Sequence, residues 1–197
     1  NTNDVDAGET ITDSGGAADV VAIVTTTDFS NMTAASFDDL EQIRFAGANQ
    51  TGTCTGAQFT GETLSLTETA AGTSNLIINV GSGTTATFAN MSASTFTSGS
   101  DTITINGSTG NETITGPNLA TNIDGGDGVD TLVGGNGDDV YLFNTNDVDS
   151  GETITENVSG GTDVVAIVTT TDFANMSVAS FNEIEQIRFA GANQTGT

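Results

Sequence analysis

Short stretches of alternating apolar and polar residues, separated by small polar residues, run along most of this chain. Four of the clearest are ETLSLTE at 62–68, NLIINV at 75–80, TATFANM at 85–91 and DTITING at 101–107. All four are rich in Thr, Ile, Val or Phe, and Gly, Ser, Asn and Asp mark turns between them. This pattern is typical of β-strands of about five residues joined by tight turns.

Helical periodicity is scarce in the sequence. The best candidates are ASFDDLEQI at 35–43 and ASFNEIEQI at 179–187, where acidic residues near the start suit the N-terminus of a helix. We expect at most one short helical turn at each place.

Two long segments of the chain are near-copies of one another. NTNDVDAGETIT at 1–12 returns as NTNDVDSGETIT at 144–155, and EQIRFAGANQTGT ends both copies, at 41–53 and 185–197. The offset between the copies grows from 143 to 144 residues because one loop is a residue longer in the second copy. We therefore divide the chain into one unit at 1–143 and the start of the next unit at 144–197.

A weaker echo lies inside the unit. FSNMTAASF at 29–37 resembles FANMSASTF at 88–96, which indicates diverged sub-repeats at 29–53 and 88–110. Repetition on two length scales is typical of a solenoid, in which each coil buries its apolar face only against its neighbours. We predict an all-β fold, a parallel β-solenoid of the β-roll or β-helix type with short turns and little or no helix, and expect it to belong to a longer tandem array.

A nine-residue phrase repeats in the middle of the chain, at 107–142. GGDGVDTLV at 125–133 is followed directly by GGNGDDVYL at 134–142, and degenerate phrases extend the same register upstream through GSTGNETIT at 107–115 and GPNLATNID at 116–124. Glycines at the first, second and fourth places let the backbone adopt angles closed to other residues and expose its carbonyl groups.

Two other places of the phrase carry side chains with a clear role. The sixth places add carboxylates, at Glu112, Asp130 and Asp139. The eighth places are expected to form an inward-facing apolar ladder, and they hold Ile114, Ile123, Leu132 and Tyr141.

The charge of the chain narrows its possible partners. The formal charge is −24, from 26 acidic residues against two arginines, and the chain contains no lysine and no histidine. Such a charge repels nucleic acid and anionic lipid and attracts cations. The longest apolar run, VVAIV, is too short to span a bilayer. We expect no nucleic-acid partner and no membrane insertion.

A single cysteine, Cys54, excludes an internal disulfide framework and any multi-cysteine metal site. It is either an incidental small residue or a crosslink to another chain.

Oxygen atoms are the metal donors that the glycine-rich turns offer. Carboxylates and carbonyls on flexible turns suit a hard cation, and the irregular coordination of calcium fits them better than the strict octahedron of magnesium. We predict bound Ca²⁺ with ligands from Glu112, Gly125, Gly126, Asp127, Gly128, Asp130, Gly134, Gly135, Asn136, Gly137 and Asp139. Further candidate ligands, with a solvated acidic face as the alternative, are Asp147, Asp149 and Glu152.

The phrases resemble the nonapeptide GGxGxDxUx of the repeats-in-toxin (RTX) proteins, which form a calcium-loaded parallel β-roll. Residues 137–191 are also similar to the region that commonly follows such nonapeptides in large bacterial extracellular proteins. The resemblance implies calcium between turns two phrases apart, which pairs the turn of Glu112 with that of Asp130, and the turn at 116–121 with that of Asp139. This chain departs from the family pattern at Thr121, where an acid is expected, and at Glu112, which is longer than aspartate.

Catalysis finds little support in the residues present. No histidine or lysine can serve as a base, and the serine and threonine hydroxyls have nothing to activate them. A pair of carboxylates, as in glycosidases, is the remaining arrangement. We expect that the chain is not an enzyme.

These observations favour a structural repeat of a secreted, calcium-stabilised extracellular array on a bacterial cell surface, such as a surface layer, an adhesin stalk or a matrix fibre. Such a chain would fold on calcium binding after type I export and associate with itself or with neighbouring repeats. Two alternatives stay open. One is the calcium-binding secretion tail of a larger exoprotein such as a protease or lipase. The other is an ice-binding solenoid, because the Thr-x-Thr strands at 102–105 and 113–115 resemble its threonine ladders.

Overall fold

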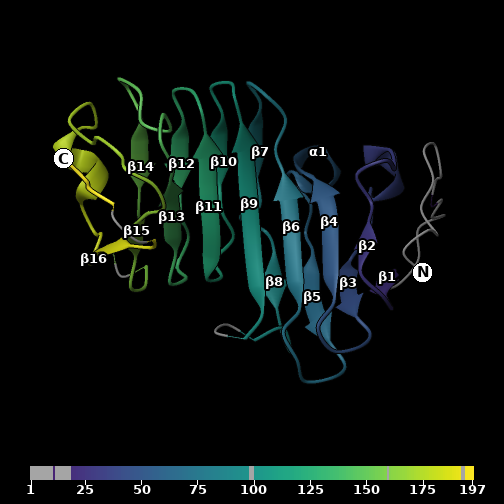
Figure 1. Ribbon diagram of the computed structural model, residues 1–197. Coiled ribbons are helices and arrows are strands. Elements are labelled where there is room, and N and C mark those ends of the chain that lie inside the picture. The colour runs from purple at the N-terminus through teal and green to yellow at the C-terminus, as the bar shows by residue number, and fades with distance from the viewer. Residues whose placement is uncertain (1–10, 12–18, 98–99, 159, 192–193) are drawn as a thin grey trace.

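A computed structural model describes residues 11, 19–97, 100–158, 160–191 and 194–197. Most of the N-terminal stretch of the first copy, at 1–12, lies outside these residues. The described strands form one long row, with residues 20–23 at one end and the C-terminus at the other (Figure 1).

The strands belong to three sheets. The first contains, in spatial order, β1 (Val20–Ile23), β3 (Gln42–Phe45), β5 (Ser65–Glu68) and β8 (Ser92–Ala93). The second contains β14 (Thr153–Thr155), β12 (Thr131–Val133), β10 (Thr113–Thr115) and β7 (Thr85–Thr87). The third contains β16 (Gln186–Phe189), β15 (Val164–Ile167), β13 (Val140–Phe143), β11 (Thr121–Gly126), β9 (Thr102–Ser108), β6 (Asn75–Asn79), β4 (Thr51–Thr55) and β2 (Thr27–Asp28).

All of the paired strands run parallel. Each strand pairs only with strands one coil earlier or one coil later, and the strands at the ends of each sheet have one partner. The chain therefore advances as a parallel β-solenoid, and the predicted fold class is confirmed. One coil takes 18 residues in the nonapeptide region, where Thr113 pairs with Thr131. It takes 28 residues where Thr85 pairs with Thr113. Two nonapeptides therefore make one coil.

Helix is nearly absent from the part of the chain that the structure describes, as predicted. The 3-10 turns η1 (Ala34–Ser36) and η2 (Val178–Phe181) lie at the start of the two segments with helical character. The single-turn helix α1 (Gly56–Phe59) was not predicted from the sequence. Thr55 and Gln58 form a capping box at its start. Among the described residues, no helix is both long and apolar enough to cross a membrane.

The core is a narrow column between the sheets. The four eighth-place residues Ile114, Ile123, Leu132 and Tyr141 are all fully buried, which confirms the apolar ladder. Burying one such side chain contributes about 1.5–3 kcal/mol. Cys54 is also fully buried, and this burial, with a smaller effect of Asp28, raises the pKa of its thiol.

The two near-copies adopt the same local structure. β1, η1 and β3 of the first copy correspond to β15, η2 and β16 of the second. A ring pair is also repeated, with centroids 5.9 Å apart for both Phe29–Phe37 and Phe173–Phe181. The sequence repeat is therefore a structural repeat.

Candidate metal centres

Three buried carboxylates form a ladder that links successive coils, and each belongs to the residue just before a strand of the second sheet. Oδ1 of Asp130 accepts the backbone N–H of Glu112 at 2.7 Å, and Oε2 of Glu152 accepts the backbone N–H of Asp130 at 2.9 Å. The three residues directly precede β10, β12 and β14, and their side chains are 0–1 % exposed. Each acid thus ties its own coil to the coil before it. Glu152, a secondary candidate in the sequence, is a full member of this ladder.

A second ladder of carboxylates belongs to residues that directly precede strands of the third sheet. Oδ1 of Asp139 accepts the N–H of Thr121, and Oδ1 of Asp163 accepts the N–H of Asp139, both at 2.9 Å. Oε2 of Glu185 then accepts the N–H of Asp163 at 2.7 Å. Thr121, where the RTX pattern expects an acid, contributes its backbone N–H here, and its hydroxyl donates to the carbonyl of Leu119 at 2.7 Å.

The first ladder leaves carboxylate oxygens without partners. Oδ2 of Asp130 and Oε1 of Glu152 are buried and accept no hydrogen bond from the described residues. Glu112 differs, because Oε1 accepts from the N–H of Gly83 and the hydroxyl of Ser108, and Oε2 accepts from the N–H of Ser108. The free oxygens therefore belong to the turns of Asp130 and Glu152, whereas Glu112 is already bonded.

Close backbone stacking explains the glycines of the phrase. A Cβ on Gly107 would lie 1.9 Å from the carbonyl oxygen of Gly125, and one on Gly128 would lie 2.0 Å from that of Gly110. Gly128 also has a φ of +123°, which side-chain-bearing residues rarely adopt. A Cβ on Gly125 would come within 2.5 Å of Oδ2 of Asp130. The glycines thus bring carbonyl oxygens of neighbouring turns together and keep space beside the free carboxylate oxygen.

Turns two phrases apart stack directly on one another. The turn at 107–112 lies against the turn at 125–130, and the second glycine-rich turn lies against 116–121 in the same way. In this second pair, a Cβ on Gly135 would be 2.0 Å from the carbonyl oxygen of Pro117. Gly134, Gly135 and Gly137 are all closely packed.

Burial of these acids alters their titration. Desolvation raises the pKa of Asp130 to about 7 and that of Glu152 to about 8, and the negative charges of neighbouring acids add to the effect. Desolvation likewise raises the pKa of Asp139 to about 7, with Glu156 and Asp163 contributing repulsion. The two arginines of the chain, Arg44 and Arg188, lie on β3 and β16, outside these turns.

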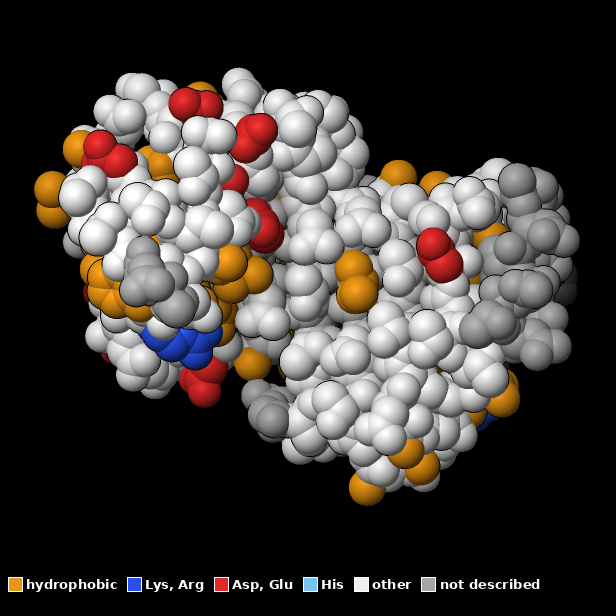
Figure 2. All heavy atoms as spheres, in the orientation of Figure 1, with side chains coloured by type: hydrophobic (Ala, Val, Ile, Leu, Met, Phe, Trp, Pro, Cys, Tyr) orange, Lys and Arg blue, Asp and Glu red, His pale blue; other side chains and the backbone are white. Residues whose placement is uncertain are grey.

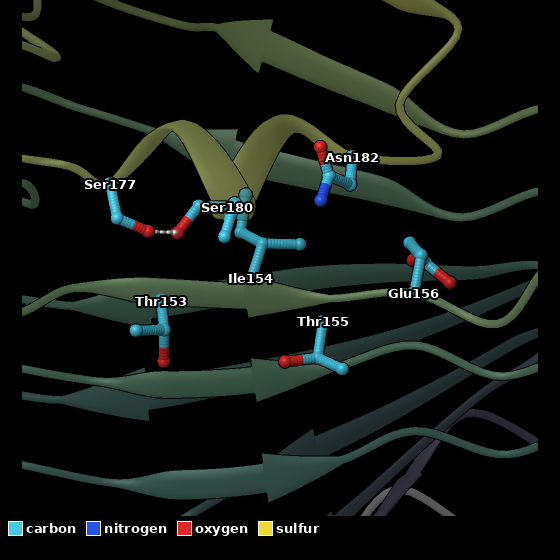
Figure 3. A pocket seen from close by; sticks show the side chains of 8 residues that line it. Thr153, Ile154, Thr155, Glu156, Ser177, Ser180 and Asn182 are labelled. Carbon is cyan, nitrogen blue, oxygen red and sulfur yellow. Dashed lines mark hydrogen bonds between the residues drawn. The ribbon is translucent and has the colours of Figure 1, made fainter.

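Three acids of the second ladder region converge on one point. Asp139, Glu156 and Asp163 each offer an oxygen, and these oxygens lie within 4.8 Å of one another. Burial raises the pKa of Glu156 to about 7. The hydroxyl of Tyr141 donates to Oε1 of Glu156. Glu156 also lines an open hollow of about 290 Å³ between β14 and η2, where Ser177 and Ser180 lie on the opposite wall (Figure 3).

The remaining predicted side-chain ligands differ in their exposure to solvent. Asp127, Asn136 and Asp149 are exposed. Asp147 is buried, and its Oδ2 accepts the backbone N–H of Asn144. It also contributes to raising the pKa of Asp124, which burial raises first.

The predicted ligand set did not include Glu156, Asp163 and Glu185. The signal that could have found two of them is position, since Asp163 and Glu185 directly precede a strand, as Asp130 and Asp139 do. Asp101 follows the same rule, because it precedes β9 and its Oδ1 accepts the N–H of Ser74 at 2.9 Å.

No protein-family model, curated protein or solved structure matches this chain.

Proposed function

We propose that this chain is a structural repeat of a secreted extracellular array, and that calcium bound between its turns stabilises the fold. The observation that carries the proposal is the pair of fully buried carboxylates, Asp130 and Glu152, each with one oxygen that accepts no hydrogen bond. A buried ionised carboxylate is strongly unfavourable unless a positive charge or hydrogen bonds compensate it.

A cation can supply that compensation. No arginine lies in these turns and the chain has no lysine, so the choice for the free oxygens lies between protonation and a bound cation. The donors are all oxygen atoms, from Asp130, Glu152 and the carbonyl groups of the stacked glycine turns, which suits calcium. Asp139, Glu156 and Asp163 provide a second all-oxygen group. When bound, calcium would supply the positive charge that lets these acids ionise inside the fold.

Dependence on calcium would also control where the chain folds. Extracellular calcium modules commonly bind with Kd of about 10⁻⁴–10⁻³ M, well above cytosolic calcium. An ion that binds only the folded chain stabilises it by mass action. The chain would then remain unfolded in the cytosol, pass outward as an extended polymer and fold where calcium is abundant. The two structurally equivalent copies support an array as the mature form.

Calorimetric titration tests the proposed site. We expect calcium to bind and Asp130→Asn to weaken the affinity by at least about tenfold, which is about 1.4 kcal/mol. Asp38→Asn is the matched control, because Asp38 is exposed and the second copy carries Asn182 at this position. Equal losses in the two variants would reject the assigned site.

A second candidate function, ice binding, is favoured by the second sheet. Thr85, Thr113, Thr131 and Thr153 occupy one column of the parallel register. A neighbouring column contains Thr87, Thr115, Val133 and Thr155. A test for inhibition of ice recrystallisation by the calcium-loaded chain distinguishes this function. Activity that Thr131→Tyr abolishes would favour it, and no activity would remove it.

A further inference from the structure

The outward face of the third sheet carries no charged residue over three neighbouring strands, β4, β6 and β9. The register places their outward side chains in three rows, each of which crosses all three strands. The rows are Thr51, Asn75 and Thr102, then Thr53, Ile77 and Thr104, and then Thr55, Asn79 and Asn106. All nine residues are at least partly exposed. We call this set of nine residues the neutral face.

Acidic residues flank the neutral face on both sides. Asp28 of β2 is the register partner of Thr53, and Asp124 of β11 is that of Asn106. Acidic side chains gather over the C-terminal part of the visible surface, whereas the surface over β9 and β6 is free of them (Figure 2). In a chain with a formal charge of −24, an uncharged face of this size favours an uncharged partner.

Hydrogen bonds between the strands hold the amide groups of the neutral face in place. Nδ2 of Asn106 donates to Oδ1 of Asn79 at 3.0 Å, and Oγ1 of Thr102 donates to Oδ1 of Asn75 at 2.5 Å. An amide has two donor hydrogens and an acceptor oxygen with two lone pairs, so each keeps positions for a ligand. Polar groups that are already ordered lose little entropy on binding. The neutral face therefore presents ordered donors and acceptors side by side.

An open hollow of about 560 Å³ adjoins the third row, where α1 follows β4. Thr55 and Asn79 belong both to this row and to the wall of the hollow. Val80 and Ala86 also line the hollow and are only 4 % and 2 % exposed, so they give it an apolar floor. All of its lining residues are uncharged. An apolar floor with hydroxyl and amide groups around it suits the C–H face and the hydroxyl groups of a sugar ring.

We propose that the neutral face and this hollow bind a neutral, extended polysaccharide that lies along the solenoid axis. Neighbouring strands are ~4.8 Å apart, which is close to the length of one sugar in an extended β-linked glucan. Successive sugars then meet equivalent hydroxyl and amide groups on successive strands. The binding requires the folded solenoid and uses none of the acidic sites.

Calorimetric titration of the folded chain in calcium tests the proposal with three hexasaccharides. Cellohexaose is neutral and extended, maltohexaose is neutral and curved, and hexagalacturonate is anionic. We expect cellohexaose to bind at least tenfold more tightly than the other two, because maltohexaose does not follow the row of strands and the acidic chain repels hexagalacturonate. Absence of cellohexaose binding, or equal binding of all three, would overturn the proposal.

Paired double variants locate the binding surface. Asn79→Ala combined with Thr104→Ala removes an amide and a hydroxyl from the neutral face and should weaken cellohexaose binding at least tenfold. Thr115→Ala combined with Thr131→Ala is the matched control, because both threonines are partly exposed on the second sheet, and it should leave the affinity unchanged. Equal losses in the two double variants would overturn the proposal. So would a dimer, detected by sedimentation velocity, that only the first double variant dissociates, because the neutral face would then join two copies of the chain.

Circular dichroism of the same samples separates this proposal from the calcium proposal. A chain that folds in calcium without binding cellohexaose would overturn the polysaccharide site and leave the calcium proposal standing. A chain that is folded in chelator and binds cellohexaose there would do the reverse.

Discussion

Acid should stabilise the calcium-free chain. Burial raises the pKa of Asp130 and Asp139 to about 7 and that of Glu152 to about 8, from ordinary values of 3.8 for Asp and 4.5 for Glu. At pH values between the ordinary and the raised pKa, the folded chain binds more protons than the unfolded chain. The stability that these three acids contribute is therefore fully present below about pH 4, and it is lost as the pH rises through 7 to 8.

The size of the effect follows from these shifts. A rise of about three units corresponds to on the order of 4 kcal/mol at pH 8 for one such group. Neighbouring carboxylates in a ladder share their protons, so the three contributions do not add, and we expect a total of roughly 4–8 kcal/mol. Because a typical domain is stable by about 5–15 kcal/mol, the calcium-free chain should be folded at pH 5 and largely unfolded at pH 8.

Thermal unfolding followed by circular dichroism measures this dependence, in calcium-depleted buffers of constant ionic strength from pH 5 to 8. We expect the Tm to fall as the pH rises. Asp130→Asn combined with Asp139→Asn should flatten the dependence, and Asp38→Asn should leave it unchanged, since that carboxylate is exposed. A Tm that increases from pH 5 to 8 would show that these buried acids are not protonated more readily in the folded chain.

Three further predictions concern glycine packing and the core. Gly125→Ala should weaken calcium binding, since its Cβ would approach the neighbouring carboxylate oxygen to 2.5 Å, whereas Gly81→Ala, with 3.7 Å to its nearest neighbour, should bind normally in calorimetry. Leu132→Ala should lower the free energy of unfolding by about 2–5 kcal/mol in calcium, because it opens a cavity in the apolar ladder, and denaturant titration measures the loss. Val133→Ala, at an outward-facing position, should lower the free energy of unfolding much less. Cys54 should resist alkylation in the folded chain and react after denaturation, and rapid alkylation of the folded chain would contradict its burial.

The fold could be predicted because its signals are local and periodic. Alternation of Thr with Ile or Leu marks the strands, and the nonapeptide count gives the 18-residue coil directly. The eighth-place ladder from Ile114 to Tyr141 follows from the same register, because every second phrase returns to the same sheet. Helix α1 escaped prediction since four residues are too few to show a helical period.

The site was only partly predictable. Beyond Asp139 the coil lengthens from 18 to 24 residues, so counting in nines does not reach Asp163. Glu156 approaches the site through a contact with Tyr141 that depends on tertiary packing. The local hydrogen bonds that occupy both oxygens of Glu112 are likewise invisible in the sequence. Two acids at the same place in the phrase can therefore differ in how many carboxylate oxygens are left to bind a metal ion.

Calcium should control the folding of this chain, and circular dichroism of the chain at pH 8 tests this dependence. The spectrum is recorded in chelator, during calcium titration, and with magnesium at the same free concentrations. We expect a largely disordered chain in chelator, cooperative appearance of β structure near millimolar calcium, and little recovery with magnesium. Full β structure in chelator, or equal recovery with magnesium, would contradict it.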